Sequence, residues 1–176
     1  AFPRGRRVLA LTGDLGRAER SRVLIRRLDE WDVFEQRGKG FGQRLALAHA
    51  HAAALLNAPV VQIGMDTPQV TPDQLDEVAG HLRHGASDAV LGFAEDGGWW
   101  VLGLAHPRWA AGLSVVPMST PMTGRATYAM LTNSGAKVIE TTALTDIDTT
   151  AEAELVALVH PGTHFGRTWR RLTDRQ

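Results

Sequence analysis

The chain has 176 residues, of which 44% are hydrophobic, so it is long and apolar enough to form one domain around a buried core. Its 19 Lys and Arg residues balance 19 Asp and Glu residues, which excludes overall charge as a driving force for binding nucleic acid or membranes. Cysteine is absent, which excludes disulfides, thiolate metal sites and a cysteine nucleophile.

Targeting and membrane signals are also missing from the pattern. No apolar run approaches the roughly 20 residues that span a bilayer, and the segment Ala1–Arg4 contains no signal-peptide core. We therefore expect a cytoplasmic protein whose partners are small molecules, with no nucleic-acid or membrane partner. Arginines are frequent near both ends of the sequence, either as solvated helix faces or as a rim that attracts phosphate.

The first part of the chain alternates strand and helix patterns. The apolar run 8–11, stopped by Thr-Gly-Asp, predicts a buried strand, and helical spacing of apolar residues predicts a helix over 15–28. A second strand is expected over 32–35 and a glycine-rich loop over 37–42. An alanine- and leucine-rich helix is expected from 43 to about 57.

The same alternation continues to the end of the chain. Thr71 with Gln74, and Thr149 with Glu152, form two capping boxes, each of which marks the start of a helix. The other elements expected here are strands over 60–63, 89–93, 99–104 and 137–140, a helix from Pro121 to about Gly135, and a helix end near His160. The pattern predicts one α/β domain over 1–176 with a mostly parallel sheet, and a turn at Gly97-Gly98 that introduces one antiparallel excursion.

Acidic residues follow two of the predicted strands. Asp66 comes after the strand 60–63, and Asp146 and Asp148 come just before the last predicted helix. Because strand carboxyl ends in an open α/β sheet lie along one edge, these side chains can share a hard divalent cation, which takes oxygen ligands. Each also has a local alternative: Asp66 as a turn residue, and the other two as partners of the helix dipole.

Two glycine-containing segments have open interpretations. Asp96-Gly97-Gly98 is either an ordinary tight turn or a place where the backbone approaches a sugar or phosphate closely, and the two tryptophans that follow it, Trp99 and Trp100, project to opposite faces of a strand. The loop from Arg37 to Gly42 matches neither a P-loop nor a dinucleotide fingerprint. Its basic residues Arg37 and Lys39 could still hold an anionic group at a helix start.

Four motifs, in this order, resemble a bacterial family of radical-SAM/selenodomain-associated, glycosyltransferase-like proteins. The family belongs to the GT-A-like nucleotide-diphospho-sugar transferase superfamily, which also contains the molybdenum-cofactor nucleotidyltransferases. The resemblance extends from about Val8 to His160, and its motifs are Gln36-Arg37-Gly38 with Gly42–Leu45, Ile63–Gln69, Glu95–Trp100 and Asp146–Thr149.

This resemblance implies a three-layer α/β/α fold and a set of site residues. Asp66 lies where relatives place the carboxylate that bridges a divalent metal to a nucleotide diphosphate, although Pro68 stands where a second acid would be. Asp148 matches the residue that completes the metal site in nucleotidyltransferases. The expected roles are catalytic for Asp66 and Asp96, metal-binding for Asp66, Asp146 and Asp148, and substrate-binding for Thr67, Gly97, Gly98, Trp99, Arg37 and Lys39.

Relatives of this kind usually begin with a strand and a basic, glycine-containing loop that holds the nucleotide. This sequence begins later, and Pro3–Arg7 is similar to that loop but lacks the strand before it. We expect the chain to lack the family's first strand and basic loop, either because a longer protein supplies them or because the nucleotide cradle has been lost.

The expected function is that of a transferase dependent on Mg²⁺ or Mn²⁺, acting on a nucleotide-activated substrate. Glycosyl transfer from a nucleotide sugar to a small acceptor is the first interpretation. Nucleotidyl transfer from a nucleoside triphosphate onto a small phosphorylated acid is an alternative, because the same metal geometry serves both reactions. A non-catalytic nucleotide-binding domain is a third. The sequence leaves the nucleotide, the acceptor and the oligomeric state open.

Overall fold

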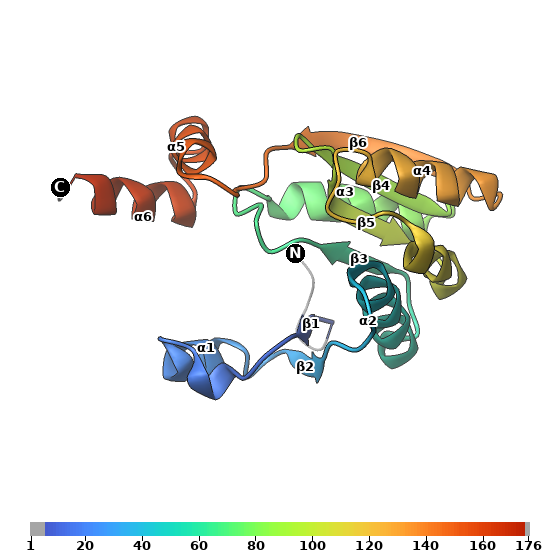
Figure 1. Ribbon diagram of the computed structural model, residues 1–176, viewed down its shortest axis with the longest axis horizontal. Helices are drawn as coiled ribbons and strands as arrows, with labels where there is room; N and C mark the ends of the chain where they lie inside the picture. The colour runs from blue at the N-terminus through green and yellow to red at the C-terminus, as the bar shows by residue number, and fades with distance from the viewer. Residues whose placement is uncertain (1–5, 175–176) are drawn as a thin grey trace.

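The computed structural model describes residues 6–174 of the chain (Figure 1). The basic segment Pro3–Arg7 therefore lies mostly outside the described residues. The strands are β1 (Val8–Leu11), β2 (Asp32–Glu35), β3 (Val60–Ile63), β4 (Ala89–Ala94), β5 (Trp99–Leu104) and β6 (Val138–Leu144). The α-helices are α1 (Ser21–Arg27), α2 (Phe41–Leu56), α3 (Pro72–Arg83), α4 (Thr123–Asn133), α5 (Thr150–Val159) and α6 (His164–Thr173), and two 3₁₀ segments are η1 (Leu15–Arg17) and η2 (Pro107–Val115).

The strands form a pair and a sheet of four. Strands β1 and β2 pair in parallel, and the larger sheet has the order β3-β5-β4-β6. Strand β5 is antiparallel to both of its neighbours, whereas β4 and β6 are parallel. Strands β3, β4 and β6 therefore share one direction. The predicted mostly parallel sheet with a single antiparallel excursion is confirmed.

Helices cover both faces of the larger sheet. Leu91 and Leu102 point to one face and join a buried cluster with residues of α2, η2 and α4. Their strand neighbours Val90 and Val101 point to the other face, where they pack with Val78 of α3. Adjacent residues of a strand project to opposite sides, so each strand contributes to both layers of the core. This arrangement confirms the three-layer α/β/α fold.

Both predicted capping boxes are present. The hydroxyl of Thr71 accepts a hydrogen bond from the backbone N–H of Gln74 at 3.3 Å, and the Gln74 side chain accepts one from the backbone N–H of Thr71 at 2.9 Å. Thr149 and Glu152 make the equivalent pair at the start of α5. Each box satisfies backbone donors that a helix start leaves without partners, so the helix begins where the sequence indicates.

Several predicted boundaries were wrong. The helix expected over 15–28 is interrupted, because the backbone of Ala18 is extended after the short 3₁₀ turn η1, whose start is capped by the Asp14 carboxylate, which accepts the backbone N–H of Gly16 at 2.8 Å. Helix α4 begins at Thr123, two residues after Pro121. The strand expected over 137–140 continues to Leu144 as β6, because it pairs along β4. The segments η2 and α6 were not predicted.

Candidate metal centre

Four aspartates follow the strands that run in the same direction. Asp66 comes after β3, Asp96 comes after β4, and Asp146 and Asp148 come after β6. Parallel strands present their carboxyl ends at the same edge of a sheet. The fold therefore gathers these acids along one edge, where the sequence predicts Asp66, Asp146 and Asp148 and where Asp96 joins them.

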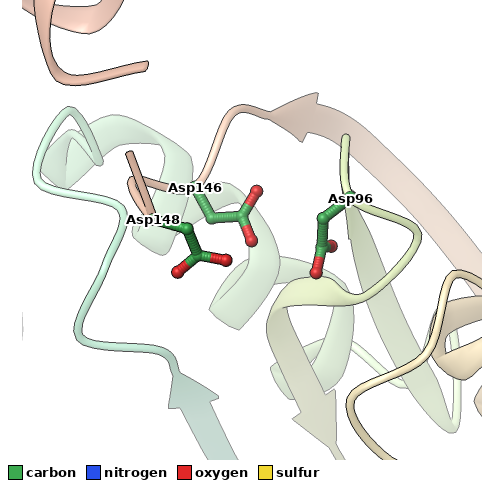
Figure 2. Close-up of side chains that lie close together, drawn as sticks. All are labelled: Asp96, Asp146 and Asp148. Carbon is green, nitrogen blue, oxygen red and sulfur yellow. The ribbon is translucent and has the colours of Figure 1, made fainter. Parts of the chain in front are cut away.

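Three of the four aspartates form a compact group. Asp96, Asp146 and Asp148 each offer a carboxylate oxygen, and these oxygens all lie within 4.8 Å of one another. Figure 2 shows Asp146 and Asp148 side by side on the segment after β6, with Asp96 facing them from the turn between β4 and β5. Three carboxylate oxygens at this spacing form a donor set that suits a hard divalent cation. We call this group the carboxylate cluster.

The carboxylate cluster concentrates negative charge around Asp146. Burial raises the pKa of the Asp146 carboxyl, and the neighbouring carboxylates of Asp96, Asp148 and Asp66 raise it further, against a hydrogen bond from its own backbone. Asp146 is half-buried, whereas Asp96 and Asp148 are exposed. A cation bound here would offset this repulsion, because it brings opposite charge within a few ångströms of all three groups.

Asp66 lies beside the cluster but does not belong to it. Its side chain is exposed and folds over Gly64, and its backbone carbonyl accepts the N–H of Ile147 at 2.9 Å. Among the described residues, the group of carboxylates close enough to share an ion contains Asp96 in place of Asp66. Strand order gives the reason: β4 and β6 are neighbours, whereas β5 separates β3 from β4.

The turn that carries Asp96 is held against the start of α4. The Asp96 carboxylate accepts the backbone N–H of Gly98 at 2.6 Å, and the Gly97 carbonyl accepts the N–H of Gly124 at 2.8 Å. Gly97 has a φ of 94°, and a Cβ there would lie 2.1 Å from the carbonyl oxygen of Pro121. Glycine is therefore required at 97 by the backbone conformation and by the contact with the residues before α4.

The consecutive tryptophans do project to opposite faces. Trp100 is 1% exposed, lies at a register shift between β4 and β5, and donates its indole N–H to the carbonyl of Thr142 at 2.9 Å. Trp99 is half-buried and packs against the core on the other face. Trp100 is thus a core residue, and a contact between Trp99 and a ligand stays a prediction.

The remaining substrate-binding candidates lie in three places. Thr67 is 5% exposed, and its hydroxyl has no hydrogen-bond partner among the described residues. Arg37 and Lys39 are exposed and line two different hollows, of about 400 Å³ and about 540 Å³. Neither hollow is lined by a residue of the carboxylate cluster. The substrate-binding roles predicted for Thr67, Arg37 and Lys39 therefore stay predictions.

Two further residues form hydrogen bonds with the backbone of the segment that carries Asp146 and Asp148. The Glu152 carboxylate accepts the backbone N–H groups of Asp148 at 2.8 Å and Thr149 at 2.7 Å, so the capping box of α5 also fixes the backbone of a cluster residue. These hydrogen bonds lower the pKa of the Glu152 carboxyl. The other is Gln69, whose side-chain amide donates to the carbonyl of Thr145. The capping pattern was a signal for Glu152, whereas Gln69 closes the motif Ile63–Gln69, from which no role was predicted for it.

Comparisons with known proteins agree with this fold. The chain matches the family described as "Uncharacterized protein conserved in bacteria (DUF2064)" over residues 1–120. A crystal structure of a candidate nucleotide-diphospho-sugar transferase from Desulfovibrio desulfuricans G20 is similar, with a TM-score of 0.65 and 20% sequence identity. The similarity covers 84% of this chain and 62% of that one, so this chain spans less than two thirds of its length. No curated protein matches the chain.

At this identity the solved structure establishes a shared GT-A-like fold. It does not confirm the radical-SAM/selenodomain-associated subfamily suggested by the motifs. Over residues 6–174, no helix combines the length and the apolar character needed to cross a membrane.

Proposed function

This chain belongs to the DUF2064 family of bacterial proteins, and on that premise we propose that it is a divalent-metal-dependent transferase that moves a sugar from a nucleotide sugar to a small acceptor. The carboxylate cluster at the carboxyl edge of the sheet is the observation that carries this proposal. The GT-A-like fold supports it, as does the description of the similar D. desulfuricans structure as a nucleotide-diphospho-sugar transferase candidate.

The donor set fits the cation that such a reaction uses. Carboxylate oxygens are the ligands that Mg²⁺ and Mn²⁺ prefer, and the cluster supplies three of them from two loops. When bound, the cation would stabilise the charge that develops on the diphosphate leaving group. Asp96, Asp146 and Asp148 are the residues we assign to hold it.

Asp66 is then available for a different task. Its carboxylate is exposed at the same edge and lies outside the cluster. We assign it to accept the proton of the acceptor hydroxyl as that oxygen bonds to the sugar carbon and the bond to the diphosphate breaks. The nucleoside diphosphate leaves with the bonding electrons. Carboxylates of Asp and Glu are among the side chains that act as general bases in such steps.

The other predicted residues would bind substrate. Arg37 and Lys39 are exposed before α2, where basic side chains and a helix start together attract phosphate oxygens. Thr67 and Gly98 lie on the loops that carry Asp66 and Asp96, and Trp99 begins β5 directly after the second of these loops. We place the sugar and acceptor against these three residues.

The test is turnover of a panel of nucleotide sugars with Mn²⁺, followed by mass spectrometry of the products. We expect release of a nucleoside diphosphate that EDTA abolishes and that Asp146→Asn reduces by at least about a hundredfold. Asp29→Asn, at an exposed aspartate before β2, is the matched control and should leave turnover unchanged.

Other products would identify the alternatives. Pyrophosphate release from a nucleoside triphosphate would indicate nucleotidyl transfer instead. Nucleotide binding that is unaffected by EDTA and by Asp146→Asn, without turnover, would contradict the proposal and indicate a non-catalytic binding domain.

A further inference from the structure

Gln69 is a buried polar residue in the loop between β3 and α3. Its side chain is 2% exposed, and its amide nitrogen donates a hydrogen bond to the backbone carbonyl of Thr145. Thr145 directly precedes Asp146, the central member of the carboxylate cluster. Gln69 therefore contacts the backbone that carries the cluster without contributing a ligand to it.

A second hydrogen bond joins the same two loops. The N–H of Ile147 donates to the carbonyl of Asp66 at 2.9 Å. The two contacts engage residues 145 and 147, so they hold the backbone on both sides of Asp146. Strands β3 and β6 lie at opposite ends of the four-stranded sheet, and no ladder pairs them. The loops that follow these strands therefore depend on such contacts for their relative position.

Packing alone does not account for a glutamine here. The Gln69 side-chain oxygen is buried and has no hydrogen-bond partner among the described residues. An unpaired buried acceptor is unfavourable, so an apolar side chain of similar size would fill this space at lower cost. What glutamine adds is the N–H group that donates to the carbonyl of Thr145, and this contact connects Gln69 to the backbone beside Asp146.

We infer that Gln69 is a positioning residue, which fastens the loop after β6 to the loop after β3 and so holds the carboxylates of Asp146 and Asp148 in place opposite Asp96. This inference rests on the proposed function, because it assigns the cluster a cation. It adds a residue that touches neither metal nor substrate.

The experiment compares Gln69→Leu and Gln69→Glu with the wild-type chain by two independent measurements. Hydrogen exchange at the Ile147 amide, followed by NMR, reports whether the two loops stay joined. Titration with Mn²⁺, followed by electron paramagnetic resonance, measures the affinity of the carboxylate cluster for the cation. Gln36→Leu, which removes a side-chain hydrogen bond to Thr12 beside the two-stranded sheet, is the matched control.

We expect Ile147 to exchange faster in both variants, while the amides inside β6 keep their protection. The affinity for Mn²⁺ should fall by about 10- to 100-fold, which is typical when a residue that orients metal ligands is removed. Gln69→Glu retains the shape of the side chain but loses the donor, so it tests the hydrogen bond even where Gln69→Leu fails to fold. Gln36→Leu should change neither measurement.

The two measurements separate the possible failures. Unchanged exchange at Ile147 would overturn the proposed joining of the loops. Faster exchange with unchanged Mn²⁺ affinity would overturn the positioning role. If the wild-type chain itself fails to bind Mn²⁺, the metal site and the positioning of its ligands are both overturned, and hydrogen exchange then decides only whether Gln69 joins the loops.

Discussion

Asp146 is the least exposed member of the carboxylate cluster, and its environment makes the metal-free fold sensitive to pH. Because burial and nearby carboxylates raise the pKa of Asp146, the folded chain binds the proton of this carboxyl more tightly than the unfolded chain does. The free energy of unfolding should therefore decrease as pH rises from the ordinary pKa of 3.8 through the raised value.

The variant Asp146→Asn stays uncharged, so it should lack this decrease. Urea denaturation in EDTA, repeated between about pH 4 and about pH 7, measures the difference between wild type and variant. Asp29→Asn controls for loss of an exposed carboxylate. Identical pH dependence in wild type and Asp146→Asn would contradict the assigned environment.

His49 of α2 predicts a pH effect of opposite sign. The ring is 1% exposed, its nitrogens have no hydrogen-bond partner among the described residues, and burial lowers its pKa to about 4, an effect that the nearby Gln62 side chain partly offsets. The unfolded chain therefore binds a proton on His49 at pH values where the folded chain keeps this ring neutral. The free energy of unfolding should fall by up to about 3 kcal/mol as pH drops from about 6.5 to about 4.

Replacing this ring by an uncharged side chain should remove that loss. His49→Leu is the variant, and His51→Gln, at an exposed histidine of the same helix, is the control. Denaturation of all three proteins across this pH range is the measurement. A wild-type stability that stays level down to about pH 4, relative to His49→Leu, would show that the ring is hydrated or paired.

At the scale of elements, the contact between α4 and the Asp96 turn can be tested with a pair of helix glycines. A Cβ at Gly124 would lie 2.4 Å from the carbonyl oxygen of Gly98, whereas a Cβ at Gly80 of α3 would meet no atom within 4 Å. Gly124→Ala should therefore destabilise the fold by about 1–3 kcal/mol through overpacking. Gly80→Ala should stabilise it by about 0.5–1 kcal/mol, because alanine favours a helix.

The same pair connects the element to the site. Since Gly98 belongs to the turn that carries Asp96, displacement of the turn in Gly124→Ala should also weaken Mn²⁺ binding, and Gly80→Ala should not. Urea denaturation and Mn²⁺ titration measure the two effects. Equal Mn²⁺ affinity in both variants would show that the packing of α4 against the turn does not determine the position of Asp96.

At the scale of the molecule, a bound cation should stabilise the whole fold. Its proposed ligands come from the turn after β4 and the segment after β6, so binding requires these segments to be folded together. A ligand that binds only the folded state adds about 2.7 kcal/mol when its concentration is a hundred times its dissociation constant. The midpoint of thermal unfolding should therefore rise with Mn²⁺ concentration.

The controls for this prediction remove the cation or one of its proposed ligands. EDTA should reverse the rise, and Asp146→Asn should abolish it, while Gln36→Leu should retain it. A rise of equal size in wild type and Asp146→Asn would indicate that the cation binds elsewhere on the chain.

Much of this architecture could be predicted because its signals are local. Capping at Thr71 and Thr149, the strands 60–63 and 99–104, and the turn at 95–98 each depend on residues a few positions apart. The alternation of these elements was sufficient for the α/β class. The broken helix after Asp14 and the unpredicted η2 lie where such signals are weak or conflict.

The site was predictable in part for the same reason. Aspartates after strand ends could be recognised from the sequence, and the fold does gather Asp66, Asp96, Asp146 and Asp148 along one edge. Which of them meet depends on strand order, which arises from contacts between distant parts of the chain. Insertion of the antiparallel β5 between β3 and β4 places Asp96, and not Asp66, with the pair after β6.

The sequence by itself determined the six strands within residues 6–174, the caps of α3 and α5 and the α/β class, because hydrophobic spacing and capping act within a few residues. Only the tertiary structure decided the membership of the carboxylate cluster and the contact between Gln69 and Thr145. Both depend on how loops from opposite ends of the sheet meet, and that meeting is set by the packing of the whole sheet.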